Sequence, residues 1–467
     1  MEAAVLNVVS TINSYLSNYV LLILLIGTGL FFTIRTRFVQ FRCFGEGWKK
    51  MFGEFSLAGG DQGGAMSSFQ AVATAVAAQV GTGNIVGACG AILIGGPGAI
   101  FWMWIIALLG MSTNYAEAVL AQKTKVIDKD GQTHGGPVYY ITTAFKGSGG
   151  KALAVFFSIA VIIALGFIGP MVQSNSIGET MNHAFNIPTW LIGLFVAVFA
   201  GFIFVGNLHR LASVTEKLVP IMAVLYVCGS LVVLVMNGSH VPEAFGLIFQ
   251  CAFNPAAGLG GAFFGIWAAV TQGAKRGLFS NEAGMGSTPH AHAQANVAKP
   301  HDQGVVAMIG VFIDTFIVLT LNALVIISTL YTPDGILANG YSETSVNAAG
   351  EAIVKSNLAQ TAFSSVFGQG FGNAFVAICL FFFAFSTVLS WNMFGKINVI
   401  YLFGKKYVRV YEVIALVFIF LGTLASNDLV WELSDMFNQL MVIPNAVALL
   451  ALTGMVVTTV KKHSQRA

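Results

Sequence analysis

Long uncharged apolar runs recur along the whole chain, and they constrain the fold more than any other feature of the sequence. Only 9% of the 467 residues are charged and 56% are hydrophobic, with a mean hydropathy of +0.77, whereas a soluble domain carries about 25% charged residues. In a lipid bilayer such runs satisfy their own backbone hydrogen bonds as helices. The sequence therefore predicts an all-α integral membrane protein. The small net charge of +3 predicts no nucleic-acid partner.

Windows of about 20 apolar residues predict eleven transmembrane helices. A leading helix covers residues 16–34, and a polar external segment covers residues 332–370. Ten further spans follow the leading helix, at residues 67–92, 98–120, 152–172, 189–205, 218–236, 260–280, 305–331, 372–391, 413–424 and 436–460.

The positions of the basic residues predict the direction of these spans. With the N-terminus outside, 22 of the 23 Lys and Arg residues, Lys275 and Arg276 among them, are assigned to the cytoplasmic side, and only Lys355 is assigned outside. Such a bias is typical of cytoplasmic segments. We therefore expect a multi-pass protein of a prokaryotic plasma membrane, with a cytoplasmic C-terminus, that functions as a monomer.

The count of spans also predicts internal symmetry. Ten helices divide into two sets of five, and because five is odd, the second set must run inverted. The predicted divisions are residues 1–65 (leading helix and connector), 66–237 (first repeat) and 238–467 (second repeat). In inverted repeats the site lies where the first helix of each half is interrupted.

The expected interruption in the first repeat is Gly81-Thr82-Gly83-Asn84. Each glycine weakens a helix by about 0.8–1 kcal/mol relative to Ala, which lets the backbone unwind. The freed amides of Thr82 and Gly83 favour an anion, and the freed carbonyls favour a cation. A zwitterionic amino acid with a sodium ion fits both ends, whereas close packing by small residues is the alternative.

Four runs of sequence resemble the alanine/glycine:cation symporters, the sodium:alanine symporter family. They are GGPGAIFWMWIIALLG at 95–110, VGTGNIVG at 80–87, MVQSNSI at 171–177 and RGLFSNEAG at 276–284. The resemblance implies a LeuT-type 5+5 inverted repeat with one extra N-terminal helix. It also implies a secondary active transporter that takes up alanine or glycine with sodium as the coupling ion and no other cofactor.

The same resemblance assigns roles to residues of the first interrupted helix. It implies that the amides of Thr82 and Gly83 hold the substrate carboxylate and that Asn84 approaches the substrate or a cation. It further implies that the backbone carbonyls of Ala77 and Val80 face a sodium ion.

The eighth span carries Ser386, Thr387 and Trp391. Thr387 and Trp391 are four residues apart and share one helix face, so both are expected to line the substrate pocket, with the indole excluding long side chains. Two hydroxyls together with carbonyls of the first span form an all-oxygen site that suits sodium. The alternative is that the hydroxyls only bond back to carbonyls of their own helix.

Polar residues in other spans complete the candidate site. Gln173 is expected to accept from the substrate ammonium or to hold the interrupted helix, with an ordinary interhelical hydrogen bond as the alternative. Thr271, Gln272 and Gly273 are expected to form the second unwound segment and to contact substrate. Asp314 lies about 15 Å inside its span, where a carboxylate indicates a second cation site, a proton acceptor or a partner for a neighbouring donor.

The remaining acids, histidines and cysteines are expected outside the transport site. Glu117 and Glu282 are placed nearer the cytoplasmic edge, with Glu282 as a gate or helix-end contact. His290, His292 and His301 are expected in a solvated loop rather than at a metal. The five cysteines are far apart, so neither disulfides nor a zinc site is predicted.

Proton coupling is the main alternative within transporters, with Lys217 as a basic residue that could replace sodium, although its expected place is the membrane edge. A passive channel or a membrane enzyme is a more distant alternative, since no filter repeat or catalytic constellation is present. The sequence leaves open the choice among L-alanine, D-alanine, glycine and slightly larger amino acids.

Overall fold

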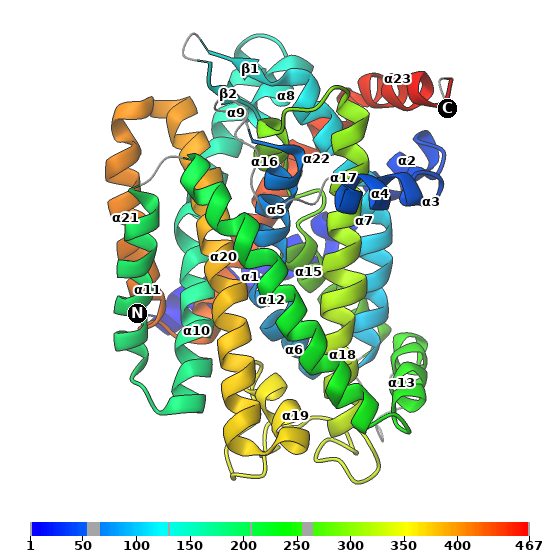
Figure 1. Cartoon of the computed structure of the whole chain (residues 1–467), viewed down its shortest axis with the longest axis vertical. Coiled ribbons are helices and arrows are strands. Elements are labelled where there is room, and N and C mark those ends of the chain that lie inside the picture. Colours follow the sequence, from blue (N-terminus) through cyan, green and yellow to red (C-terminus); the bar gives the residue numbers. More distant parts are fainter. Residues whose placement is uncertain (1, 54–65, 129–130, 206–207, 255–264, 466–467) are drawn as a thin grey trace.

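The computed structural model describes residues 2–53, 66–128, 131–205, 208–254 and 265–465, and helices make up most of them (Figure 1). Residues 260–264 of the sixth predicted span, residues 54–65 of the connector, Lys129 and Arg466 lie outside the described residues.

The elements of the first part of the chain are α1 (Glu2–Tyr15), η1 (Leu16–Leu21), α2 (Leu22–Arg35), α3 (Val39–Arg42), α4 (Phe44–Gly53), α5 (Ser68–Gln79), η2 (Gly83–Gly87), α6 (Ala88–Gly95), α7 (Gly98–Thr124), β1 (Val126–Ile127), β2 (Thr133–His134), α8 (Pro137–Ala144), α9 (Ser148–Val161), η3 (Ile162–Ile168), α10 (Gly169–Phe185), α11 (Thr189–Phe204) and α12 (Leu208–Met236). The strands β1 and β2 form an antiparallel pair.

The elements of the second part are α13 (Val241–Phe253), α15 (Ile266–Asn281), α16 (Pro289–Gln294), α17 (Pro300–Phe312), η4 (Ile313–Leu319), α18 (Thr320–Leu330), α19 (Leu358–Phe367), α20 (Gln369–Phe403), η5 (Lys405–Tyr407), α21 (Val408–Gly422), α22 (Asn427–Ala451) and α23 (Thr453–Ser464).

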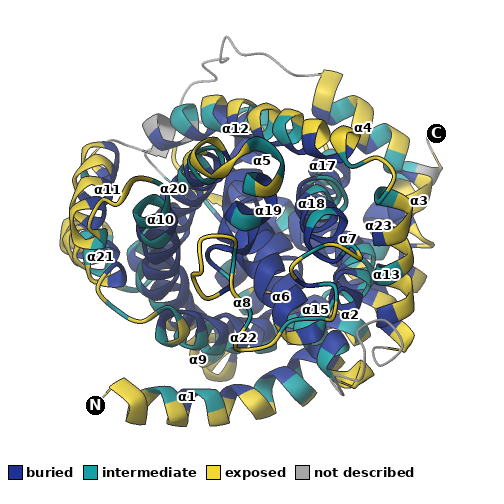
Figure 2. Cartoon of the chain, turned by 90° about the horizontal axis from the view of Figure 1, so that it is seen from below, coloured by how far each residue is buried: buried dark blue, intermediate teal, exposed yellow. Residues whose placement is uncertain are grey.

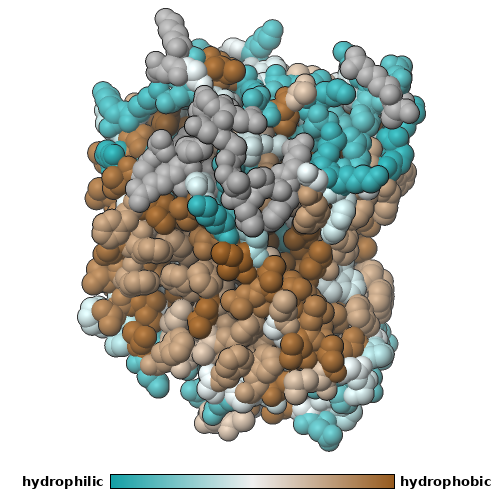
Figure 3. Space-filling model, viewed as in Figure 1, coloured by the Kyte–Doolittle hydropathy of each residue, from teal (hydrophilic) through white to brown (hydrophobic). Residues whose placement is uncertain are grey.

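Within the described ranges, seven helices are long and apolar enough to cross a membrane, or eight if α5 and η2–α6, which bend by 43°, count as one span. Shorter apolar helices, α11 and α13, accompany them. Figure 3 shows an apolar band across the middle of the molecule with hydrophilic ends above and below. This is the surface expected of a chain surrounded by lipid. The count of eleven spans stays a prediction.

The tenth predicted span, 436–460, is wrong at both ends. The Ser426 side chain accepts from the Leu429 amide and starts α22 at Asn427, and the backbone of Leu452 leaves the helical region after Ala451. The polar helix α23, with Lys461 and Lys462 in its last turn, turns across the upper end of the molecule (Figure 1).

Buried residues gather around α5, α6 and α15 at the centre, while α11 and α21 expose outer faces (Figure 2). Two departures from helical geometry lie in this buried region. The helix α5 begins with a capping box between Ser67 and Gln70 and ends at Val80, whose φ of −78° and ψ of 85° are not helical. The helix α15 ends at Glu282, whose φ is 58°. Both breaks therefore expose backbone groups inside the protein.

Candidate substrate and cation site

The break after α5 is held by side-chain oxygens. The amide of Gly81 donates to Asn84 Oδ1 at 3.0 Å, and the amide of Thr82 donates to Gln173 Oε1 at 3.2 Å. Gln173 comes from α10, so it holds the interrupted helix, which is one of its two expected roles. Thr82 Oγ1 and Gln173 Nε2 are buried without a hydrogen-bond partner in the described part of the chain. Such buried polar groups ordinarily find a partner, so the break has free donors for a ligand.

The hydroxyls of α20 lie against the end of α5. Thr387 Oγ1 donates to the carbonyl of Ala77 at 2.8 Å, and Ser386 Oγ lies 3.4 Å from the same oxygen. Both hydroxyls also bond back to the carbonyl of Phe383. Hydroxyl and carbonyl oxygens from two helices therefore meet at one buried point. Val80, the remaining expected ligand, is the buried residue that ends α5.

The carboxylate of Asp314 is fully buried and joins three elements. It accepts from Asn84 Nδ2 at 2.6 Å, from Ser280 Oγ at 2.9 Å and from Thr315 Oγ1 at 2.8 Å. These contacts agree with the interpretation that Asp314 pairs with donors of neighbouring helices. They also gather four oxygen-bearing groups beside the break, when the Asn84 amide is included, which is the ligand chemistry of a hard cation.

Trp391 is the largest side chain at the site, and it is fixed on three sides. Its indole Nε1 donates to Glu282 Oε1 at 2.5 Å, and its ring meets the ring of Phe279 edge-on with centroids 5.8 Å apart. A Cβ at Gly169 of α10 would overlap the indole, so the α10 backbone touches the ring directly. The indole therefore forms a rigid wall.

The second break lies at Glu282–Thr288, and the expected break at Thr271–Gly273 is wrong. Thr271, Gln272 and Gly273 all lie inside α15, where Thr271 Oγ1 bonds to the carbonyl of Trp267. The residues of α15 that pack against Gly83 are Phe279 and Ser280, about two turns later. Gly273 does not end the helix; its lack of a side chain instead allows α15 to approach Trp102 and Ala99 of α7 closely.

Glu117 of α7 organises this second break, and sequence reasoning missed it. Its carboxylate accepts from the amides of Gly284 and Gly286 at 3.0 Å each and from Asn445 Nδ2 at 2.6 Å. Glu117 and Glu282 are both fully buried, and Glu282 is a helix-end residue, as expected. A signal was present, since Gly284-Met285-Gly286 repeats the glycine spacing of Gly81-Thr82-Gly83.

Arg276, which is expected on the cytoplasmic side, and Lys355, which is expected outside, lie beside the same aromatic ring. Arg276 forms a two-pronged ion pair with Asp435, at 3.2 and 3.0 Å, and Lys275 Nζ lies 2.8 Å from the same carboxylate. The Arg276 guanidinium also lies 4.6 Å from the centroid of Trp431, and the ammonium of Lys355 lies 5.5 Å from that same ring. Lys275 and Arg276 are held by acids of α22 and are not free to solvent.

The expected solvated loop of histidines is also wrong. His290, His292 and His301 are each at most 2% exposed. His290 is bonded to the carbonyl of Ser287 and to Asn398, and His292 is bonded to Gln303. The local sequence is polar enough to suggest a loop, but packing against neighbouring helices buries it.

A buried site between two interrupted helices, inside a helical bundle with an apolar band, defines a membrane transporter rather than an enzyme. The sodium:alanine symporter family model matches residues 2–467, and the chain belongs to that family. The sodium/alanine symporter AgcS of Methanococcus maripaludis is 39% identical over 98% of this chain and 97% of that protein. The amino-acid carrier protein AlsT of Bacillus subtilis is 36% identical over 95% of this chain and 89% of that protein.

The fold is of the LeuT type. The structure of MhsT in complex with L-phenylalanine superposes with a TM-score of 0.60 at 12% identity, covering 84% of this chain and 94% of that one. A manganese transporter of Eremococcus coleocola superposes with a TM-score of 0.51 at 12% identity, covering 85% and 86%. At these identities the likeness concerns the fold alone.

Proposed function

We propose that this protein takes up alanine or glycine across a prokaryotic plasma membrane by sodium-coupled symport. One observation carries the proposal: the hydroxyl of Thr387 meets the carbonyl of Ala77 at the end of α5, directly beside the backbone amide of Thr82. Oxygen ligands for a cation and amide donors for a carboxylate are thus adjacent. A zwitterionic amino acid and a sodium ion have this pair of charges.

In the proposed complex the substrate carboxylate replaces the Gln173 oxygen on the amide of Thr82 and also contacts Gly83. A carboxylate forms stronger hydrogen bonds with N–H donors than a neutral amide oxygen does. The freed Gln173 side chain and Asn84 then contact the substrate. Thr387 and Trp391 close the far side of the pocket, and the indole limits the side chain to the size of alanine or glycine.

The first sodium is held by the carbonyls of Ala77 and Val80 and by the hydroxyls of Ser386 and Thr387. A second cation is held at Asp314, supported by its burial against Asn84 and Ser280. The hydrogen bond from Ser280 to Asp314 also connects this second cation site to α15. The contribution of Thr271, Gln272 and Gly273 to substrate binding is restricted to shaping α15, since Phe279 and Ser280 stand between them and Gly83.

Sodium and substrate are coupled through the break after α5. A sodium ion on the Ala77 carbonyl orders the segment that presents the Thr82 amide, so sodium raises the affinity for substrate. By linkage, substrate raises the affinity for sodium by the same factor. Rocking of one helix bundle against the other around the site completes the transport cycle.

Proton coupling is the second candidate, and Asp314 supports it because a buried carboxylate can carry a proton across. Lys217 gives it no support, since its side chain is exposed to the surroundings of the bundle. We also propose that the protein acts as a monomer with its N-terminus outside and its C-terminus in the cytoplasm.

Uptake of labelled alanine into proteoliposomes tests the proposal. We expect accumulation with an inward sodium gradient, and none when choline replaces sodium at constant pH. Competition by glycine, D-alanine, L-alanine and glutamine then ranks the substrates. Accumulation driven by a pH gradient without sodium would replace sodium coupling with proton coupling. Equal substrate affinity in sodium and choline would contradict both the first cation site and the linkage.

A further inference from the structure

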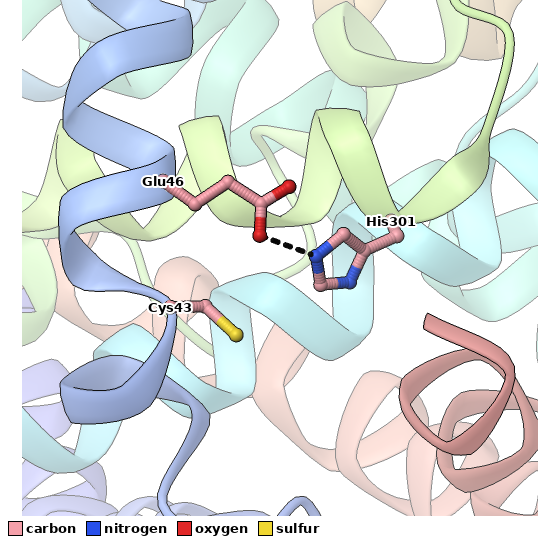
Figure 4. Close-up of side chains that lie close together, drawn as sticks. All are labelled: Cys43, Glu46 and His301. Carbon is pink, nitrogen blue, oxygen red and sulfur yellow. Dashed lines mark hydrogen bonds and ion pairs between the residues drawn. The ribbon is translucent and has the colours of Figure 1, made fainter. Parts of the chain in front are cut away.

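A cluster of metal-ligating side chains lies apart from the transport site, at the end of the molecule where α4, α17 and α23 meet (Figure 1). Cys43 directly precedes α4, Glu46 is in the first turn of α4, and His301 is in the first turn of α17. One ligand atom from each lies within 4.8 Å of the other two. Figure 4 shows Glu46 and His301 pointing toward one another with the Cys43 sulfur turned toward the same space.

A fourth donor comes from the C-terminal helix. His463 Nε2 lies 2.9 Å from Glu46 Oε2, and His301 Nε2 lies 3.3 Å from the same oxygen. The two imidazole rings stack with centroids 3.7 Å apart and planes 17° apart. Two ring nitrogens from different helices are thus aimed at one carboxylate. Both can turn a lone pair toward an ion there.

The outer contacts of the cluster resemble those of metal-binding histidines. His301 Nδ1 is hydrogen-bonded to the hydroxyl of Tyr115 at 2.7 Å, which fixes the ring and leaves Nε2 for the ligand. Metal-bound histidines almost always have such a partner on the second nitrogen. His301 is 2% exposed and Cys43 is 7% exposed, while the side chains of Glu46 and His463 remain 29% and 23% exposed. The cluster is therefore anchored inside and open to an ion from the surface.

We propose that Cys43, Glu46, His301 and His463 form a zinc site that joins the connector after α3, the start of α17 and the C-terminal helix. A thiolate, two imidazoles and a carboxylate are zinc ligands, and the thiolate and the imidazoles are poor ligands for sodium or magnesium. Tetrahedral nitrogen, oxygen and sulfur ligands at zinc distances lie about 3.3–3.6 Å apart. Cys43, Glu46 and His301, whose ligand atoms lie within 4.8 Å of one another, therefore need to approach slightly, and His463, which is not part of that set of three, has to approach them as well. One zinc ion, one thiolate and one carboxylate sum to zero charge, which suits a membrane edge.

Proton release accompanies binding. A cysteine thiol is mostly protonated at neutral pH, so the metal-free Cys43 carries its proton. Coordination forms the zinc–sulfur bond and passes that proton to water. Each histidine retains one N–H, and on His301 it is the Nδ1–H, which donates to Tyr115. Zinc affinity therefore increases with pH.

Cobalt titration of the purified full-length protein, stripped with a chelator, tests the site directly. We expect one cobalt ion per chain, a thiolate-to-cobalt absorption band and displacement by zinc. Cys43→Ser removes the band, and His463→Ala weakens cobalt affinity at least tenfold. Tyr115→Phe, which changes only the outer contact, weakens it by about 10- to 100-fold.

Matched controls are Cys228→Ser, an exposed cysteine on α12, and His240→Ala, an exposed histidine that pairs with Glu243. Both are expected to leave cobalt binding unchanged. Since His463 is on a surface helix, its variant keeps the test informative if Cys43→Ser does not fold. Absence of stoichiometric cobalt in the wild type, or a band that persists in Cys43→Ser or depends on Cys228, would overturn the site. None of these measurements depends on transport.

Discussion

The indole N–H of Trp391 donates to the carboxylate of Glu282 across 2.5 Å, and this contact joins the middle of α20 to the break that follows α15. Both side chains are at most 1% exposed. The carboxylate also accepts from the hydroxyl of Ser287 within the break. The wall of the proposed pocket and the second interrupted helix are therefore held together by one acid.

Replacement of the Trp391 indole separates its role as the pocket wall from its hydrogen bond to Glu282. In Trp391→Phe a ring remains but the buried acceptor of Glu282 loses a donor, which costs about 1–3 kcal/mol. We expect a lower melting temperature and uptake of alanine reduced about tenfold, measured on purified protein and in proteoliposomes. Glu282→Gln, which can keep an acceptor oxygen toward the indole, is the matched variant. It should lose less activity than Trp391→Phe, and the reverse order would contradict this role of the contact.

The hydroxyl of Thr387 is predicted to set the sodium dependence of transport. Thr387→Val keeps the shape but removes an oxygen ligand, so the sodium concentration for half-maximal uptake should rise about tenfold, equivalent to about 1.4 kcal/mol. Thr387→Ser retains the oxygen and should stay within about threefold of wild type. Thr329→Val of α18, whose hydroxyl bonds only to carbonyls of its own helix, is the control. Equal sodium dependence in Thr387→Val and Thr387→Ser would refute the ligand role.

Gly81 and Gly87 are predicted to respond oppositely to the same added methyl group. A Cβ at Gly81 overlaps Thr387 Oγ1 and lies 3.3 Å from Gln173 Oε1, whereas a Cβ at Gly87 meets its nearest neighbour, the Trp431 ring, at 3.6 Å. Gly81→Ala should therefore abolish sodium-dependent uptake. Gly87→Ala should be active and at least as stable as wild type, because alanine favours the helix by up to about 1 kcal/mol. Sodium-dependent uptake and thermal unfolding, measured for both variants, check these two predictions.

Glu117 is predicted to be required for the geometry of the second break. Glu117→Gln turns one acceptor into a donor among three N–H groups, so at least one of the amides of Gly284 and Gly286 or the Asn445 amide loses its partner. A cost of about 1–3 kcal/mol is expected, seen as a lower melting temperature together with reduced uptake. Glu343→Gln, at an exposed carboxylate outside both sites, should change uptake little. A Glu117→Gln protein of wild-type stability would show that these hydrogen bonds are dispensable.

The class of the protein followed from the sequence because membrane insertion depends on length and polarity alone. The first break was located from Gly81 and Gly83, since paired glycines weaken a helix whatever surrounds it. The second break was misplaced at Gly273, because a glycine also permits close packing, and here it lies against Trp102 and Ala99 of α7. Whether Gly273 breaks its helix or permits close packing depends on Trp102, which is about 170 residues away in sequence.

Partners that are distant in sequence also explain the other differences. Arg276 and Asp435 lie on different helices, Glu117 of α7 binds Gly284 in the break after α15, and no local pattern pairs them. Predicting the direction of the spans from Lys and Arg assumes that these side chains lie in solvent outside the membrane. Arg276 instead forms an ion pair with Asp435 inside the protein. The roles of Thr82, Gln173 and Asp314 in binding stay predictions until the transport measurements are made.

Trp431, Phe279 and Trp391 form a series of contacting aromatic rings from Arg276 to the proposed pocket. The ring centroid of Phe279 lies 4.7 Å from that of Trp431 and 5.8 Å from that of Trp391, and the Arg276 guanidinium lies 4.6 Å from the Trp431 centroid. Close-packed rings transmit displacement because no free volume absorbs it. A change in the position of the Trp391 indole would therefore have to be accommodated by Phe279 and Trp431, the rings that connect it to the Arg276–Asp435 ion pair. Direct contacts thus connect the proposed pocket to the buried charges of Arg276 and Asp435.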